Sequence, residues 1–254
     1  MIRALESSFI YFPSREQAAT PADYGLRAET LALEAGGGVR LAGWWIHGDG
    51  RRALLLFHGN GGNASHRLER AKLLVEAFGL DVALVDYRGY GASTGEPSED
   101  GLYADGEAIY LAAAGRGFAP GRIVLFGESL GCAVALETAL RHRCGGVILE
   151  TPFLSIAAMA RRYYPFVPPF LLRTKYDNER KIAAVTAPKL IMSAEKDDVV
   201  PPDHARRLFE LARPPKEFYV IRGATHNDTY IVGGRDYLEA WRRFLDGLEA
   251  APSP

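Results

Sequence analysis

Two periods of apolar residues along this chain predict two kinds of structure. Residues 30–35 and 39–46 alternate apolar with polar or small positions, and the triplet Gly36-Gly37-Gly38 separates them. A period of two residues on both sides of a glycine-rich turn is typical of an antiparallel β-hairpin. We therefore expect the chain to begin its sheet with two antiparallel strands.

From residue 53 onward, short apolar runs alternate with longer segments of helical character. The short runs predict strands at 53–57, 82–86, 123–126, 146–149, 189–193 and 218–221. The longer segments predict helices near 63–78, 102–114, 130–142, 203–212 and 235–249. Repeated strand–helix units predict an α/β fold, with a mostly parallel sheet of about eight strands and helices on both faces.

Residues 152–187 break this alternation. Prolines interrupt the interval and aromatic residues crowd it, so we expect a short cap excursion above the strand ends, which returns through a short helix at 178–185. No segment has the composition of a linker. The chain is therefore expected to form a single domain over residues 1–254.

Composition narrows the function classes. The 254 residues carry a formal net charge of −1, and paired arginines are scattered, which argues against a nucleic-acid surface. No apolar stretch approaches the ~20 residues of a membrane span, and the N-terminus MIRALESSFIYF lacks the apolar core of a signal peptide. Only Cys132 and Cys144 are present, so we expect no disulfide framework and a cytoplasmic location, with an anchor upstream of this sequence as the alternative.

The segment Gly127-Glu-Ser129-Leu-Gly131 carries the first chemical signal. It matches G-x-S-x-G, the nucleophile elbow, between a predicted strand and a predicted helix. The alternative is a glycine-flanked serine that only caps the helix. A serine hydroxyl needs a base and an orienting acid to become a nucleophile, so the partners decide between the two interpretations.

Candidate partners follow the next predicted strands. Asp197 and Asp198 lie after the run 189–193, and His226 lies after the run 218–221. The chain order Ser, Asp, His is that of the α/β-hydrolase arrangement. Spacing favours Asp197 as the acid, while Asp198 and Glu150, at the end of the run 146–149, stay open as alternatives.

The loop Phe57-His-Gly-Asn-Gly-Gly-Asn63 could supply backbone donors for an oxyanion. The same loop also fits a dinucleotide fingerprint, Gly59-x-Gly61-x-x-Ala64, with Asp86 at the end of the next strand. That remote interpretation leaves Ser129, Asp197 and His226 without a role. The six histidines show no spacing typical of metal ligands, so we expect no metal site.

Five motifs together resemble a known superfamily. HGNGG, DYRGYGASTG, GESLG, KDDVVPP and GATHND are similar to those of single-domain serine hydrolases with the α/β-hydrolase fold, in the bud-emergence-type branch, which resembles the protein depalmitoylases. The resemblance covers residues 8–246. It implies Ser129 as nucleophile, His226 as general base and Asp197 as its acid. It also implies an oxyanion hole formed by the backbone N–H groups of Asn60 and Leu130.

The expected function is hydrolysis of carboxylic esters or thioesters of short to medium acyl groups through an acyl-enzyme, with a small-molecule substrate and no cofactor. Phe153, Tyr163 and Phe166 are expected to line the acyl pocket, although they could simply pack the cap onto the sheet. Alternatives are a serine peptidase or aminopeptidase-like amide hydrolase, a long-chain acyl-protein thioesterase (a depalmitoylase) and, more remotely, a non-catalytic binder. The sequence does not indicate the oligomeric state.

Overall fold

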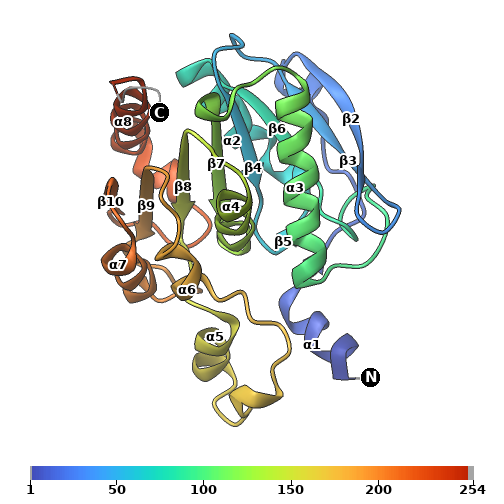
Figure 1. Cartoon of the computed structure of the whole chain (residues 1–254), viewed down its shortest axis with the longest axis vertical. Coiled ribbons are helices and arrows are strands. Elements are labelled where there is room, and N and C mark those ends of the chain that lie inside the picture. Colours follow the sequence, from blue (N-terminus) through green and yellow to red (C-terminus); the bar gives the residue numbers. More distant parts are fainter. Residues whose placement is uncertain (1, 251–254) are drawn as a thin grey trace.

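The computed structural model describes residues 2–250, and its centre is a mainly parallel sheet (Figure 1). Within those residues the sheet has eight strands in the order β10-β9-β8-β7-β4-β6-β3-β2. The strands are β2 (Ala28–Ala35), β3 (Val39–Ile46), β4 (Ala53–Phe57), β6 (Asp81–Val85), β7 (Ile123–Glu128), β8 (Gly146–Glu150), β9 (Lys189–Ala194) and β10 (Lys216–Ile221).

The hairpin and the six later strands confirm the sequence predictions to within two residues at each end. β2 pairs with β3 in antiparallel register, and β3 is also antiparallel to β6. All other neighbours in this sheet are parallel, so the carboxyl ends of β4 and of β6 to β10 point to one edge. Loops that leave this edge therefore meet above the sheet.

Helices cover both faces of the sheet, as predicted. One face carries α2 (Leu68–Phe78) and α8 (Thr229–Ala250), and the other carries α3 (Glu99–Gly115), α4 (Leu130–Arg141) and α7 (Pro202–Leu211). The helix predicted at 235–249 is the second part of α8. Gly234 has φ 48° and ψ −124° and kinks this helix directly before residue 235.

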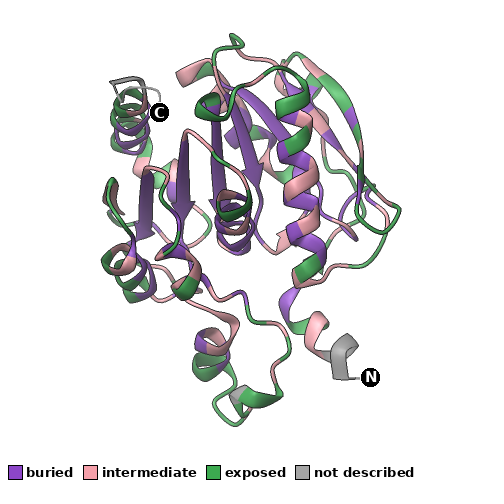
Figure 2. Cartoon of the chain, viewed as in Figure 1, coloured by how far each residue is buried: buried purple, intermediate pink, exposed green. Residues whose placement is uncertain are grey.

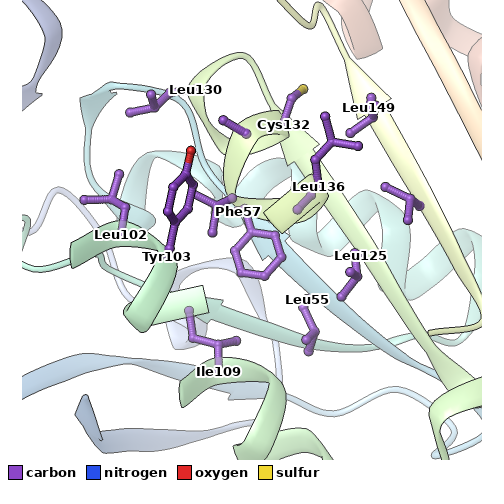
Figure 3. Close-up of a cluster of buried hydrophobic side chains, with 14 of the residues drawn as sticks. Leu55, Phe57, Leu102, Tyr103, Ile109, Leu125, Leu130, Cys132, Leu136 and Leu149 are labelled. Atoms are coloured by element: carbon purple, nitrogen blue, oxygen red, sulfur yellow. The ribbon is translucent and has the colours of Figure 1, made fainter. Parts of the chain in front are cut away.

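Alternation along the buried strands divides the core into two layers. In β4, Leu54 and Leu56 face α2 and α8, whereas Leu55 and Phe57 face α3 and α4. Figure 3 shows Leu55 and Phe57 beside Leu125 of β7 and Leu136 of α4. Figure 2 shows the central strands buried along their length. Burying each such side chain contributes roughly 1.5–3 kcal/mol, so these central strands form a stable platform for the loops at their carboxyl ends.

The cap follows β8, as expected, but it contains a helix that the sequence interpretation left out. Ser155 begins α5 (Ile156–Tyr163) by accepting a 3.1 Å hydrogen bond from the Ala158 amide. The chain then passes through η4 (Pro169–Leu171) and α6 (Asn178–Ile182) before it enters β9. Among residues 2–250, no helix is long and apolar enough to cross a membrane.

A second unpredicted helix lies beside the cap. α1 (Ile2–Ile10) occupies the same end of the molecule as α5 (Figure 1). The Phe9 and Tyr164 rings pack edge to face with their centroids 5.5 Å apart. The carboxylate of Glu6 accepts a 2.8 Å hydrogen bond from the Thr174 amide. Thus α1 contacts the cap at Tyr164 and at Thr174, although more than 150 positions separate these residues from α1 in the sequence.

Candidate active site

Ser129 lies at a sharp turn between β7 and α4. Its φ of 50° and ψ of −111° fall in a region that non-glycine residues rarely adopt, and its amide donates a 2.9 Å hydrogen bond to the Glu150 carbonyl of β8. The glycines that flank Ser129 are required because neighbouring backbone atoms approach them closely. A Cβ on Gly127 would lie 2.5 Å from the Cys132 backbone, and one on Gly131 would lie 1.9 Å from the Phe57 carbonyl oxygen.

His226 and Asp197 form a close pair at the ends of β10 and β9. Nδ1 of His226 lies 2.9 Å from each carboxylate oxygen of Asp197. The amides of Val199 and Val200 donate to Oδ1 of Asp197 at 2.9 and 2.7 Å. Because the loop amides hold the carboxylate and the carboxylate holds the ring, the imidazole orientation is determined by backbone geometry.

The two alternative acids lie elsewhere. Glu150 is buried on the face of α2 and α8, where its carboxylate accepts hydrogen bonds from Arg70 at 2.6 Å, Thr229 at 2.5 Å and Tyr237 at 2.8 Å. Asp198 is exposed, and its carboxylate lies 3.4 Å from the backbone amide of His226. Among residues 2–250, Asp197 is the acid whose carboxylate contacts the His226 ring.

The amides of Asn60 and Leu130 both border the space above Ser129. Neither donates a hydrogen bond to another residue within the described chain. Nδ1 of His58 lies 2.8 Å from the carbonyl oxygen of Gly59, which belongs to the same peptide unit as the Asn60 amide. Burial, together with the charge of Arg67, lowers the pKa of His58 to about 4. The imidazole is therefore neutral near pH 7, with its proton on Nδ1, where it can be donated to Gly59.

Two cavities meet at Ser129, and both also contain Asn60. The larger, of about 650 Å³, extends under the cap. Apolar side chains dominate its lining, and these come from the cap, α1 and the loop after Asp197. The smaller, of about 310 Å³, is lined by Gly59, Asn60, Gly61, Gly62, His66, Arg67, Glu128, Ser129, His226 and Asn227.

Phe153, Tyr163 and Phe166 all lie in the lining of the larger cavity. Phe153 is buried, whereas Phe166 is 79% exposed at the mouth. The Tyr163 hydroxyl donates a 2.5 Å hydrogen bond to the Val199 carbonyl. Of the three, only Phe153 is buried in the core, as a side chain that packs the cap onto the sheet would be.

Glu128 forms ion pairs with two arginines, and the sequence interpretation missed these contacts. Its carboxylate lies 2.9 Å from Nε of Arg67 and 3.5 Å from Nη1 of Arg70. Burial raises the pKa of this carboxyl, but the charges of Arg67 and Arg70 outweigh burial and hold the pKa at about 2. An ion pair therefore adjoins the serine on the side of the smaller cavity.

The surroundings of Asp86 differ from those that the dinucleotide fingerprint predicts. The fingerprint's acid should face a ribose, but Asp86 is buried and accepts a 2.7 Å hydrogen bond from the Ala64 amide. Burial raises its pKa to about 6. Asp86 thus anchors the backbone directly after the loop 57–63. No group of three or more His, Cys, Asp or Glu side chains among residues 2–250 could hold a metal ion.

Sequence reasoning expected Tyr163 of α5 in the larger cavity, but it missed the lining that α1 and the rest of α5 supply. Glu6, Phe9, Ile10 and Phe12 line it from the N-terminal segment, and Met159 lines it from α5. The helical spacing of Ile2, Leu5 and Phe9 is the sequence signal that could have revealed α1. No local pattern indicates that this helix meets residues more than 150 positions away.

Comparisons with known proteins identify the family of this chain. The profile of a family described as "Serine aminopeptidase, S33" matches residues 48–178. An uncharacterized protein of Mycobacterium tuberculosis (strain ATCC 25618 / H37Rv) is 39% identical over 241 residues, covering 93% of this chain and 85% of its own length. Protein bem46 of Schizosaccharomyces pombe is 34% identical over 246 residues, covering 91% and 81% of the two chains.

Among solved structures, the Pyrococcus furiosus esterase Pf2001 superimposes with a TM-score of 0.76. Its sequence is 20% identical, and the alignment covers 94% of this chain and 98% of the esterase. That identity supports a shared fold alone, whereas the sequence relatives and the matching profile show the family. The chain belongs to the α/β-hydrolase superfamily and is a hydrolase of the branch that resembles bem46 and depalmitoylase-like proteins.

Proposed function

We propose that this hydrolase is a serine esterase or thioesterase that cleaves short to medium acyl groups from small molecules through an acyl-enzyme on Ser129. The observation that carries the proposal is that several groups needed for acyl transfer lie together around Ser129. The strained Ser129 and the Asn60 amide border both cavities. The Leu130 amide borders the larger cavity, and the oriented imidazole of His226 borders the smaller. These are the parts that acyl transfer requires.

In the first half-reaction, Oγ of Ser129 bonds to the substrate carbonyl carbon while its proton passes to Nε2 of His226. Asp197 stabilises the resulting imidazolium through Nδ1. The carbonyl oxygen becomes an oxyanion, and the amides of Asn60 and Leu130 donate to it. The bond from carbon to the leaving oxygen or sulfur then breaks, and the leaving atom takes the proton from His226.

In the second half-reaction, water replaces the leaving group. His226 accepts a proton from the water, whose oxygen bonds to the acyl carbon. The ester bond to Ser129 then breaks, and Oγ takes the proton back. The products are a carboxylic acid and the free enzyme, so atoms and protons balance without a cofactor.

Acyl size follows from the larger cavity. Its volume of about 650 Å³ lies within the range of sites for small organic ligands, and it exceeds what an acetyl group would fill. Each buried methylene adds ~0.8 kcal/mol of binding until the cavity is full. We therefore propose a preference for acyl chains of about two to eight carbons, with the longer of these favoured.

Two alternatives remain distinct. A long-chain thioesterase is favoured by the exposed mouth at Phe166, through which a longer chain could extend. A peptidase is favoured only by the description of the matching family.

We further propose that the chain acts as a single domain and, on the basis of its two unpaired cysteines, in the cytoplasm.

The decisive test is covalent labelling of the serine. A fluorophosphonate probe should label Ser129 alone, and Ser129→Ala should lose labelling and at least roughly three orders of magnitude in turnover while keeping its thermal stability. Ser14→Ala is the matched control, because among residues 2–250 the Ser14 hydroxyl makes only a 3.4 Å contact, with the Glu16 carbonyl. Undiminished hydrolysis by Ser129→Ala would exclude the proposed mechanism. Comparing p-nitrophenyl esters, acyl thioesters and aminoacyl amides then separates esterase, thioesterase and peptidase.

A further inference from the structure

The two cavities at Ser129 have opposite chemistry. The larger is lined mainly by apolar side chains, whereas glycines and the polar side chains of His66, Arg67, Glu128 and Asn227 line the smaller. We propose that the smaller cavity is the leaving-group subsite, and that it selects an uncharged alcohol or thiol bearing a hydrogen-bond acceptor such as an amide. This inference rests on the proposed acyl-transfer function and specifies its substrate class.

The position of His226 determines which part of the substrate enters which cavity. When the scissile bond breaks, the leaving oxygen or sulfur must take its proton from His226. His226 lines the smaller cavity and is absent from the lining of the larger one. The leaving group therefore departs through the smaller cavity, and the acyl chain occupies the larger one.

Hydrogen-bond donors are concentrated in this subsite. Arg67 uses Nε for Glu128, and its Nη2 makes a 3.4 Å contact with the Gly61 carbonyl. Its Nη1 has no partner among residues 2–250. Nδ1 of His66 lies 3.2 Å from the Asn63 amide nitrogen and 3.1 Å from the Asn63 side-chain oxygen, so Nδ1 is occupied within its own turn and Nε2 is the ring nitrogen that can meet a ligand.

The charges of the subsite are internally balanced. Glu128 pairs with Arg67 and Arg70, and Arg70 also pairs with Glu150 at 2.6 Å. Two guanidinium groups thus face two carboxylates, which leaves no net charge to recruit an ionic leaving group. A purely alkyl leaving group would cover donors without satisfying them, and leaving buried polar groups unpaired is costly.

The test compares two butanoyl thioesters of equal size. One leaving group is N-acetylcysteamine, which carries an amide, and the other is 4-methylpentanethiol, its alkyl counterpart. The wild-type protein should favour the amide-bearing substrate by roughly tenfold or more in kcat/KM, since one hydrogen bond to a charged donor gives a difference of this order. His66→Phe and Arg67→Gln should bring this ratio toward one, mainly by raising KM for the amide-bearing substrate.

Met159→Ala is the matched control, because Met159 lines only the larger cavity. It should lower kcat/KM for both thioesters and leave their ratio unchanged. His66→Phe keeps an aromatic ring and carries the test if Arg67→Gln does not fold. A wild-type ratio near one, a preference for the alkyl thioester, or a ratio that both variants leave unchanged would overturn the subsite.

Failure of the subsite is distinguishable from failure of the function. Equal hydrolysis of both thioesters, abolished in Ser129→Ala, would reject the leaving-group inference and leave acyl transfer intact. Equal hydrolysis by the wild-type protein and by Ser129→Ala would reject the function, and the inference with it.

Discussion

The hydroxyl of Tyr163 donates a hydrogen bond to the backbone carbonyl of Val199, 2.5 Å away, and this bond joins the cap to the loop that carries Asp197. The Val199 amide in turn donates to the Asp197 carboxylate at 2.9 Å. The Tyr163 side chain therefore contributes in two ways. It lines the larger cavity, and its hydroxyl supports the loop that carries Asp197.

These two contacts of Tyr163 can be separated by substitution. Tyr163→Phe keeps the ring and removes the hydrogen bond, so we expect turnover to fall by roughly two- to tenfold with an unchanged acyl-chain preference. Tyr163→Ala should lower turnover and also move the preference toward longer chains. Both are measured as kcat and KM on p-nitrophenyl butyrate and octanoate. A changed chain preference in Tyr163→Phe would contradict this division.

The three candidate acids should respond differently to neutral substitution. Asp197→Asn should cut turnover by roughly three to four orders of magnitude, because the amide no longer holds the reactive tautomer of His226. Asp198→Asn should cost far less, since Asp198 is exposed and its carboxylate lies 3.4 Å from the His226 backbone amide and not beside the ring. Steady-state kinetics on one ester, with circular dichroism to verify folding, compare the variants.

Glu150→Gln should act on stability instead of on the chemical step. The substitution removes the charge that Arg70 meets at 2.6 Å, and loss of one partner of a buried pair costs roughly 3 kcal/mol or more. We expect a clearly lower free energy of urea unfolding, with turnover of the folded fraction close to wild type. If Glu150→Gln lowered turnover more than Asp197→Asn, the assignment of the acid would be wrong.

Phe166 should limit acyl-chain length at the cavity mouth. Its side chain is 79% exposed, so Phe166→Ala should hardly change stability but should move the optimum of kcat/KM toward longer p-nitrophenyl esters. Phe170→Ala is the control, because Phe170 is 84% exposed and lies outside the lining. An identical shift in both variants would mean that exposed apolar area, and not the cavity, controls chain length.

Glu128 should contribute acid-sensitive stability. Its pKa in the fold is about 2, below the ordinary 4.5, so its ionised form stabilises the protein above pH 4.5 and this contribution is lost as the pH falls toward 2. The shift corresponds to about 3 kcal/mol. Glu128→Gln should therefore unfold at lower urea concentration at pH 7 and show a shallower loss between pH 4.5 and 2. Glu76→Gln, on an exposed i,i+4 pair with Lys72, should match the wild-type slope.

The sheet and the positions of Ser129, Asp197 and His226 could be predicted because local patterns specify them. Strands buried on both faces read as continuous apolar runs, and the turn at Ser129 needs small residues beside it because the neighbouring backbone approaches within van der Waals distance. Parallel strands then bring the residues that follow them to one edge. Each of these steps depends on a few consecutive residues.

The contacts that could not be predicted join residues that are distant in the sequence. Arg70 meets Glu150 and Glu128 through packing of α2 against the sheet, and no pattern near Arg70 signals a buried charge. The polar character of the smaller cavity likewise depends on His66 and Arg67, in the 3-10 helix Ala64–Arg67, lying beside His226, which follows β10. Such pairings are set by tertiary packing and not by periodicity.

The contacts of α1 have a practical consequence for handling this protein. Glu6 accepts hydrogen bonds from the Arg173 and Thr174 amides, and Phe9 and Phe12 line the larger cavity. If the larger cavity holds the acyl chain, as proposed, we expect substrate preference to depend on residues 6–12, although the sheet and the Asp197–His226 pair lie elsewhere. An affinity tag or a trimmed N-terminus could alter measured chain-length selectivity in a protein that still folds and turns over. Substrate profiles should be compared between proteins tagged at the C-terminus, where α8 ends away from the cap (Figure 1).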